Sequence, residues 1–476
     1  MMRNAFWFAI IACAVPLLAQ SKENASPERL ITLNLAATNT RDEPVTDLKS
    51  ADIQLREDGK PQPIAFFQFA GSSRAMAPPG PGEFANHAEA PPVVILLDRW
   101  NERLVMSSRS GIELGAAIQR METVGNVYIY FLTNKGELAS VHPLPGADED
   151  LHPAANPSPA QLRAELDQGI QQYQGFRSRD DLGVRINTTF QGLETLCNKM
   201  SAIAGRKSLI WVTEGIPLML RSGQRVGTVD FTPQVRSLSE LAAQSQIAMY
   251  TVDQTNGTGA SELSRTLEMF SALTGGRWYA RDDAAGALAN ALTDARGSYR
   301  LAYYSAAPEK DSKEYKIRLD TPRKGVHLLA REGFTGGIAG STPEQIETAA
   351  LNNQIDSPVD AAEIGLRVAL SRPQQNGAVH FDIHIDPADV LIDHNGEHYQ
   401  AKLDVIVAFY SEGKLKGTSP ATRTDLTFTQ AQMDRANKQG ILIPLNLPVG
   451  SEIQNARLIV FDPVLHVLGS VTVPAK

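Results

Sequence analysis

Three acidic side chains stand where a β-sheet could bring them together. Asp98 ends the apolar run Val93–Leu97, Glu102 lies four residues later, and Glu214 follows the apolar segment Ser208–Thr213. Short apolar runs of this kind are typical of parallel strands that are buried on both faces. The carboxyl ends of parallel strands meet at one edge, where open α/β sheets bind ligands. We therefore expect the three acids to lie close together at that edge.

Hydroxyl groups from another segment could complete this acidic site. Thr188 and Thr189 stand at the start of a predicted helix that leads into the strand before Glu214. Carboxylate and hydroxyl oxygens are the ligands that a hard cation such as Mg²⁺ prefers. If the edge holds a cofactor, the donors predict Mg²⁺ or another divalent cation. Trp100 and Asn101 lie beside the acids and are predicted ligand contacts, since aromatic residues are enriched at binding hot spots.

Regular alternation of strands and helices predicts an α/β domain over residues 92–297, with a parallel sheet covered by helices on both faces. The predicted strands are Val93–Leu97, Asn126–Leu132, Ser208–Thr213, Ile247–Asp253 and Gly276–Tyr279, with an antiparallel edge strand at Gly136–His142. The predicted helices are Ser107–Thr123, Pro159–Gln172, Thr188–Ala204, Thr232–Gln244, Ser261–Leu273 and Asp283–Ala295. This arrangement is Rossmann-like.

Two short β segments flank the α/β domain, over residues 28–71 and 298–334. Each is too small to be stable alone, so we expect them to form one small β-sandwich into which the α/β domain is inserted. Residues 72–91 are rich in Pro and Gly and predict a linker, and residues 335–357 predict a second linker with a short helix. Residues 358–476 contain closely spaced strand patterns and predict a C-terminal all-β sandwich.

The chain resembles the von Willebrand factor type A domain family, and within it a bacterial secreted subgroup. The resemblance covers most of the chain and rests on the combination and order of several segments, which are residues 44–58, Val93–Asp98, Gly205–Gly215, Leu273–Arg277, Ser298–Tyr304 and Arg331–Phe334. It implies a metal-ion-dependent adhesion site at the carboxyl edge of the sheet. The family builds that site from an Asp-x-Ser-x-Ser motif, a Thr in a later loop and an Asp after the central strand.

Carried over by position, Asp98 matches the first Asp of the motif, Glu214 occupies the last Asp position, and Thr188 or Thr189 matches the Thr. Trp100 and Glu102 occupy the two Ser positions, so neither supplies a hydroxyl. An indole offers only a hydrogen-bond donor and cannot ligate a cation. The resemblance therefore implies a degenerate site, and both a bound cation and a metal-free acidic edge stay open.

The N-terminus predicts export. Residues 1–19 combine a basic start, a short apolar core and a small residue before polar sequence, which is typical of a signal peptide. An alternative cleavage would leave Cys13 lipidated. Removal of residues 1–19 leaves Cys197, which lies in a helical pattern and is expected to be a buried packing thiol. We expect no transmembrane span in the mature chain. We expect the chain to be periplasmic or secreted.

Composition and motifs favour a binding module. The 476 residues carry a net charge of −8 without a long run of like charges, which argues against a nucleic-acid partner. No motif of an activated nucleophile is present, so we expect no catalytic residue and no enzyme activity. The leading hypothesis is a protein–protein interaction or adhesion module with a protein partner. The alternatives are a metal-dependent hydrolase and a structural cell-envelope protein with no specific ligand.

Overall fold

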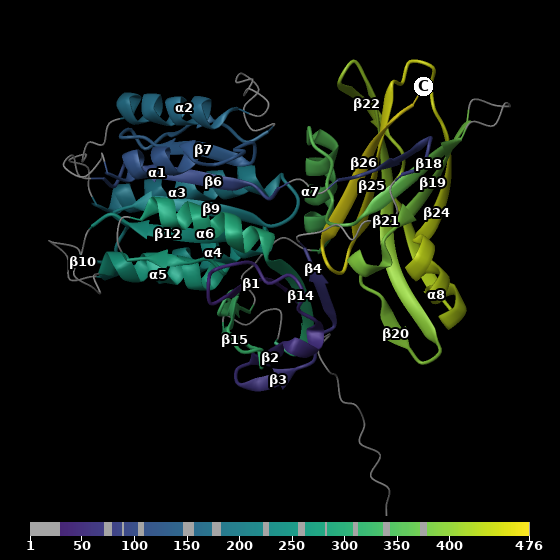
Figure 1. The fold of residues 1–476 in the computed structure, drawn as a ribbon, viewed down its shortest axis with the longest axis horizontal. Helices are drawn as coiled ribbons and strands as arrows, with labels where there is room; N and C mark the ends of the chain where they lie inside the picture. Colours follow the sequence, from purple (N-terminus) through teal and green to yellow (C-terminus); the bar gives the residue numbers. More distant parts are fainter. Residues whose placement is uncertain are drawn as a thin grey trace, which may run out of the picture.

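The computed structural model describes residues 29–70, 79–87, 90–102, 109–145, 157–173, 182–221, 228–255, 262–280, 283–307, 313–336, 343–371 and 378–475. The predicted signal peptide and Cys13 lie outside these residues. Figure 1 shows an α/β part, a small β part packed beside it, and a larger β part at the far end.

A six-stranded sheet forms the centre of the α/β part, in the order β13-β12-β9-β6-β7-β8. These strands are β6 (Val93–Asp98), β7 (Val127–Leu132), β8 (Leu138–His142), β9 (Lys207–Thr213), β12 (Ile247–Asp253) and β13 (Trp278–Tyr279). The neighbours are parallel except β8, which runs antiparallel to β7, as the sequence predicts. Every residue of β6, β9 and β12 is buried, which agrees with the apolar runs at their centres.

Helices cover both faces of this sheet, so the mixed α/β class predicted from the sequence is confirmed. They are α1 (Arg109–Gln119), α2 (Pro159–Gln172), α3 (Leu182–Ser201), α4 (Thr232–Gln244), α5 (Glu262–Thr274) and α6 (Ala284–Arg296). Val94 and Leu96 of β6 share a core with α3, α4 and α5. Val93, Ile95 and Leu97 face the other way and share a core with α1, α2 and α6.

Helix α3 begins earlier than the sequence predicts. Thr188 and Thr189 lie within its second turn and not at its start. The hydroxyl of Thr189 donates a 2.9 Å hydrogen bond to the carbonyl oxygen of Arg185, one turn back, which satisfies this polar side chain inside the helix. Ile186, Thr189 and Leu193 are all fully buried, so the helix packs against the core from its second turn onward.

The segments on either side of the α/β part share two antiparallel sheets, β16-β1-β14-β4 and β17-β15-β2-β3. The strands are β1 (Arg29–Asn39), β2 (Gln54–Glu57), β3 (Lys60–Gln62), β4 (Phe66–Phe69), β14 (Ser298–Ser305), β15 (Glu314–Asp320), β16 (Val326–Leu329) and β17 (Gly333–Thr335), and a short 3-10 helix spans Ser50–Asp52. Pairing of β1 with β14 and of β2 with β15 joins residues more than 200 positions apart. Both sheets contribute to one core.

The C-terminal part contains the sheets β24-β19-β18-β5 and β20-β21-β25-β26, with β22 and β23 paired to β21. The elements are α7 (Pro343–Asp356), β18 (Leu366–Ser371), β19 (Ala378–Ile385), a 3-10 helix (Pro387–Asp389), β20 (Asp393–Asn395), β21 (His398–Ser411), β22 (Lys414–Thr418), β23 (Thr422–Phe428), α8 (Gln430–Gln439), β24 (Ile441–Pro448), β25 (Asn455–Asp462) and β26 (Val467–Pro474). Alternate residues of β19 are buried, which is the pattern of a sheet with one face in a core.

Two features of this part correct the sequence analysis. Strand β5 (Glu83–Ala85) belongs to the segment predicted as a linker, yet it pairs with β18 at the edge of a sheet. Three residues are too few to display an alternating pattern. Helix α8 lies in a segment predicted to be all strands and turns. It starts at a capping box of Thr429 and Gln432, and it buries only Met433 and Ala436, so its apolar signal is weak.

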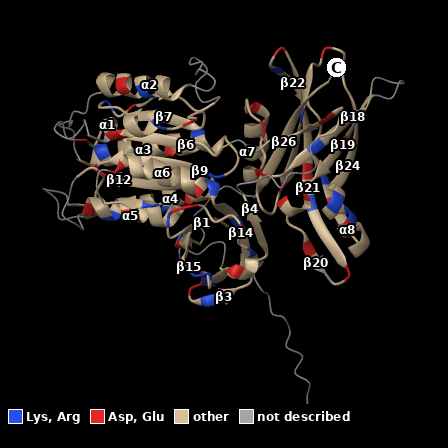
Figure 2. Ribbon diagram, in the orientation of Figure 1, with Lys and Arg blue, Asp and Glu red and all other residues tan. Residues whose placement is uncertain are grey.

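Acidic and basic residues are interspersed over all three parts of the chain (Figure 2). This distribution agrees with the modest net charge of −8. Among the described residues, no helix is both long and apolar enough to cross a membrane.

Candidate functional site

Asp98 lies at the point where the strand order of the central sheet reverses, between β6 and β9. This switch point is where open α/β sheets form their ligand crevice. Four donors surround the Asp98 carboxylate. Oδ2 accepts from Thr213 Oγ1 at 2.7 Å, Trp211 Nε1 at 3.2 Å and Asn101 Nδ2 at 2.8 Å, and Oδ1 accepts from the backbone of Asn101 at 3.0 Å.

The Asp98 carboxylate is almost completely removed from water, with 1% of the residue exposed. Burial raises the pKa of Asp98, because a charged carboxylate loses hydration inside the protein. The hydrogen bonds from Asn101, Thr213 and Trp211 oppose that shift in pKa without reversing it. The Asp98 carboxylate is therefore stabilised by hydrogen-bond donors of the protein in place of water.

Asn101 connects the end of β6 to α3. Its amide nitrogen donates to Asp98 and, at 2.8 Å, to Thr189 Oγ1. Its amide oxygen accepts from Arg185 Nη2 at 3.1 Å. The structure thus brings Thr189 into the group around Asp98, while Thr188 is only half-buried and packs toward Gly136.

Glu102 and Glu214 complete the acidic group that the sequence predicts. Both are buried, with 1% and 4% of each residue exposed. Glu102 forms an ion pair with Arg99. Burial raises the pKa of Glu102, the Arg99 guanidinium lowers it, and the nearby carboxylates of Asp98 and Glu214 raise it again. The carboxylates of Asp98 and Glu214 therefore lie close enough to Glu102 to disfavour its charged form.

The sequence predicts Trp100 as a ligand contact, but the indole is not presented at the surface. Only 4% of Trp100 is exposed, and its ring joins the core between the sheet and α3. The indole Nε1 donates to the carbonyl oxygen of Arg185 at 3.2 Å. Asn101, the second predicted contact, is 1% exposed. A large apolar ring with one satisfied donor is more stable in the core than in water, so Trp100 acts as a packing residue at this edge.

Three features of this group disfavour a divalent cation. Both oxygens of Asp98 already accept hydrogen bonds, Glu102 is paired with Arg99, and the indole of Trp100 fills a position where the resemblance implies a hydroxyl. Across the described ranges, no group of three or more His, Cys, Asp or Glu side chains is arranged to hold a metal ion. Positive charge at this edge comes instead from the guanidinium groups of Arg99 and Arg185.

Sequence reasoning missed both arginines. Arg99 lies three residues before Glu102, a spacing that would have suggested an ion pair. Arg185 lies four residues before Thr189, which places both on one side of a helix. That signal was hidden because the helix was predicted to begin after Arg185.

Exposed apolar side chains surround this closed edge. In the described ranges, seven large hydrophobic residues are exposed, namely Ile112, Leu182, Val184, Met219, Val229, Leu415 and Leu442. The first five belong to elements that begin at or leave the carboxyl edge: the first turns of α1 and α3, and the hairpin of β10 (Met219–Arg221) with β11 (Thr228–Asp230). Figure 1 places β10 at the end of the α/β part that is remote from the C-terminal sandwich.

Comparisons with known proteins give little help. The chain matches no family model and no curated protein. Among solved structures it is similar to the pilus adhesin SpaC from Lactobacillus rhamnosus GG, with 9% sequence identity and a TM-score of 0.28. That match covers 90% of this chain and 58% of the adhesin, so the chain spans a little over half of the adhesin's length.

Proposed function

We propose that this chain is an exported protein-contact module of the von Willebrand factor type A kind, whose carboxyl edge binds a protein partner without a metal ion. Export rests on the signal-like residues 1–19. The family assignment rests on the sequence motifs together with the strand order of the central sheet, which reverses between β6 and β9. An adhesive role is the form of protein contact that this resemblance implies.

The observation that carries the proposal is the position of the exposed apolar side chains. Exposed hydrophobic residues that gather in one region of the surface are typical of protein-interaction sites. Five of the seven such residues in the described ranges lie around a single edge of the sheet, on four different elements. Val184 and Val229 are 53% and 48% exposed, and they come from α3 and β11. Burial of these side chains by a partner would contribute to binding through the hydrophobic effect.

The buried polar centre of the edge gives this surface a rigid base. Asp98, Asn101 and Thr189 join β6 to α3 through hydrogen bonds, and Trp100 packs against α3. A preorganised surface loses less conformational entropy when a partner binds. The same hydrogen bonds leave Asp98 poorly placed to activate water, so the hydrolase alternative has no favourable geometry at this carboxylate.

A site-specific crosslinking experiment tests the proposal. The photoreactive residue p-benzoylphenylalanine replaces Val184, Val229 or Leu442 in separate samples of the mature chain, which are illuminated in envelope extracts of the producing organism. Leu442 is the matched control, because it is 50% exposed but lies in the C-terminal sandwich. We expect the same adduct from Val184 and Val229, no such adduct from Leu442, and no effect of EDTA.

Three results would contradict this function. Equal adducts from all three positions would show nonspecific contact, and the absence of adducts at Val184 and Val229 would favour a structural envelope protein. An adduct that disappears with EDTA would instead restore a metal-dependent contact.

A further inference from the structure

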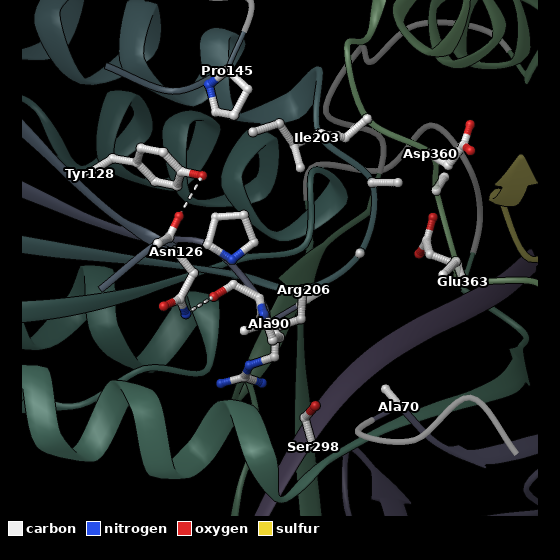
Figure 3. Close-up of a pocket in the computed structure, with 18 of the residues that line it drawn as sticks. Ala70, Ala90, Asn126, Tyr128, Pro145, Ile203, Arg206, Ser298, Asp360 and Glu363 are labelled. Atoms are coloured by element: carbon white, nitrogen blue, oxygen red, sulfur yellow. Dashed lines mark hydrogen bonds between the residues drawn. The ribbon is translucent and has the colours of Figure 1, made fainter. Parts of the chain in front are cut away.

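A cavity of about 690 Å³ lies where the three parts of the chain meet, at the end of the central sheet that is remote from the carboxyl edge. Figure 3 shows Asp360 and Glu363 on the side of the C-terminal part, across from Asn126 of the α/β part. Glu363 forms an ion pair with Arg300 of β14 and accepts from Gln246 at 2.7 Å. The cavity therefore marks the joint between the C-terminal sandwich and the rest of the chain. The described residues that line it include none from β22 or β23.

Strand β23 forms an open edge of the C-terminal sandwich. Among the described strands it pairs with β21 alone. The side chains of Arg423, Asp425 and Thr427 are exposed, whereas Leu426 and Phe428 pack against the core of the sandwich. The side of β23 that faces away from β21 is therefore accessible to another strand.

The register shows which backbone groups lie on this open side. Ser419, just before β23, donates from its backbone nitrogen to the carbonyl oxygen of Val407 at 2.8 Å. Val405, two residues earlier on β21, directs its backbone groups to the same side and opposes Thr422. Because this direction alternates along a strand, the backbone groups without a partner strand in the described part of the chain belong to Arg423, Asp425 and Thr427.

Other strand edges of the molecule are protected. Pro444 interrupts β24 and Pro61 interrupts β3, and a proline offers no N–H to an incoming strand. Strand β22 has Lys414 and Lys416, and lysines on an edge discourage pairing. Strand β23 contains neither proline nor lysine, and it is the longest proline-free strand in the described ranges that pairs with one strand only.

The exposed face of this edge has alternating charges. Arg423 opposes Asp404 of β21, and Asp425 opposes Lys402. Arg423 donates to the Asp404 carboxylate from Nε at 2.9 Å and from Nη2 at 2.8 Å. It also lies 2.9 Å from Glu347 of α7. Since paired residues share a face of the sheet, β23 presents one positive and one negative side chain side by side along its open edge.

We propose that two copies of this chain pair through β23, antiparallel to each other, about a two-fold axis at Thr424. Antiparallel pairing that centres on Thr424 brings Arg423 of each copy opposite Asp425 of the other. Both residues have outward backbone groups, as the hydrogen bonds of such a pair require. Charges then alternate in sign across four strands, in the order Asp404, Arg423, Asp425 and Lys402. A surface that is complementary to itself is what a two-fold interface needs.

The charges also select this register over its neighbours. Pairing that centres on Asp425 would place two Asp425 carboxylates opposite each other, and pairing that centres on Arg423 would do the same with two guanidinium groups. Like charges that are directly opposite destabilise a sheet, whereas opposite charges stabilise it. The register at Thr424 gives two opposite-charge pairs and no like-charge pair between the strands.

Pairing of one short strand buries a small interface, so we expect a reversible dimer that forms at high concentration. A two-fold dimer would carry two copies of the carboxyl edge, and two linked contacts raise the avidity for a partner. That consequence rests on the function proposed above, whereas the pairing of β23 does not.

Sedimentation velocity of the mature chain tests the pairing, at concentrations from about 1 to 100 μM, the range of weak complexes. We expect the wild-type chain to shift from monomer to dimer. Asp425→Arg places arginine opposite arginine at both pairs, and Arg423→Asp places aspartate opposite aspartate at both. Each variant alone should stay monomeric. An equimolar mixture of the two variants restores opposite charges at both pairs and should form a heterodimer.

Two further variants separate the backbone edge from surface charge in general. Asp425→Pro removes an outward N–H without removing a bond to β21, so this variant should fold and stay monomeric. Glu452→Arg makes a comparable change of charge at an exposed turn between β24 and β25, and it should dimerise like the wild type. Circular dichroism checks that every variant is folded.

The proposal fails if the wild-type chain is monomeric at all concentrations, or if folded Asp425→Arg or Asp425→Pro still dimerises. It also fails if Glu452→Arg abolishes the dimer, or if the mixture of Asp425→Arg with folded Arg423→Asp stays monomeric. If Arg423→Asp does not fold, because it places a second carboxylate beside Asp404, the two variants at position 425 still decide the outcome.

Discussion

The hydroxyl of Thr213 donates a 2.7 Å hydrogen bond to the carboxylate of Asp98, across the two strands between which the sheet order reverses. Both residues are buried, and Thr213 Oγ1 also accepts from the backbone nitrogen of Gly215 at 2.9 Å. One hydroxyl therefore links the acid at the end of β6 to the turn that follows β9. In this chain a donor from the protein itself engages the carboxylate oxygen that could otherwise ligate a cation.

Replacement of Thr213 by valine keeps the shape of the side chain but removes this hydroxyl. Asp98 would lose one of four donors while it stays buried, so we expect the free energy of unfolding to fall by about 1–3 kcal/mol. Urea denaturation followed by circular dichroism measures the change. Thr422→Val on the exposed strand β23 is the control and should alter stability little. Equal losses in the two variants would argue that the bond to Asp98 contributes nothing.

Divalent cations should not stabilise the wild-type chain. The four donors to Asp98 and the ion pair of Glu102 with Arg99 occupy oxygen atoms that a cation would need as ligands. A ligand present at 100 times its Kd would add about 2.7 kcal/mol of stability, which is easily seen as a rise in Tm. We therefore expect the same Tm in millimolar MgCl₂, MnCl₂ and EDTA. A rise in Tm with Mg²⁺ that is lost in Asp98→Ala would disprove the metal-free interpretation of the edge.

The sequence was sufficient to predict the central sheet and the placement of Asp98 and Glu214 at one edge of it. Strands such as Val93–Asp98 are buried on both faces, and their continuous apolar runs are the direct result. Once β6 and β9 are parallel neighbours, topology alone brings Asp98 and Glu214 to one edge. These features depend on local patterns and on general rules of connection, so a single sequence contains them.

The closure of the site could not be predicted in the same way. Whether Trp100 projects outward or folds into the core depends on space beside α3, which only the packed structure defines. The pairing of Arg99 with Glu102 likewise depends on both side chains being enclosed together. Strand β5 shows the same limit, because its three residues are ordered by pairing with β18 and not by a pattern of their own.

Glu363 holds the three parts of the chain together. Its carboxylate is paired with Arg300 of β14 and accepts from Gln246, which follows α4, at 2.7 Å. The Arg300 and Glu363 side chains are only 3% and 7% exposed, so loss of one charge leaves the other buried and unpaired. We expect Glu363→Gln to cost about 3 kcal/mol. Differential scanning calorimetry should then resolve a separate transition for the C-terminal sandwich.

A double variant tests whether the pairing itself is responsible. Arg300→Met with Glu363→Leu removes both charges and should recover much of the stability that Glu363→Gln loses. Asp320→Asn disrupts the exposed pair of Asp320 with Arg318 and is the control. If the double variant is as unstable as the sum of its two single variants, the ion pair is not what joins these parts.

His142 gives the stability of the α/β part a defined pH dependence. It ends β8, is 3% exposed, and stacks on Tyr128 with ring centroids 5.6 Å apart. Burial lowers the pKa of His142 below its ordinary value of 6.5. Its Nδ1 lies 3.2 Å from Glu165, but burial also raises the pKa of that carboxyl, so both shifts favour a neutral pair. The folded chain therefore resists protonation of this imidazole.

The sign of the effect follows from proton linkage. Between the lowered pKa and 6.5 the unfolded chain binds more protons at this histidine than the folded chain, so the contribution of His142 to stability grows as pH rises and is complete above about pH 6.5. Its slope is at most about 1.4 kcal/mol per pH unit. We expect His142→Gln to flatten the rise in unfolding free energy over this window, whereas His398→Gln, at an exposed position, should leave it unchanged. Urea denaturation at half-unit steps of pH measures both, and an unaltered slope in His142→Gln would show that other groups dominate this window.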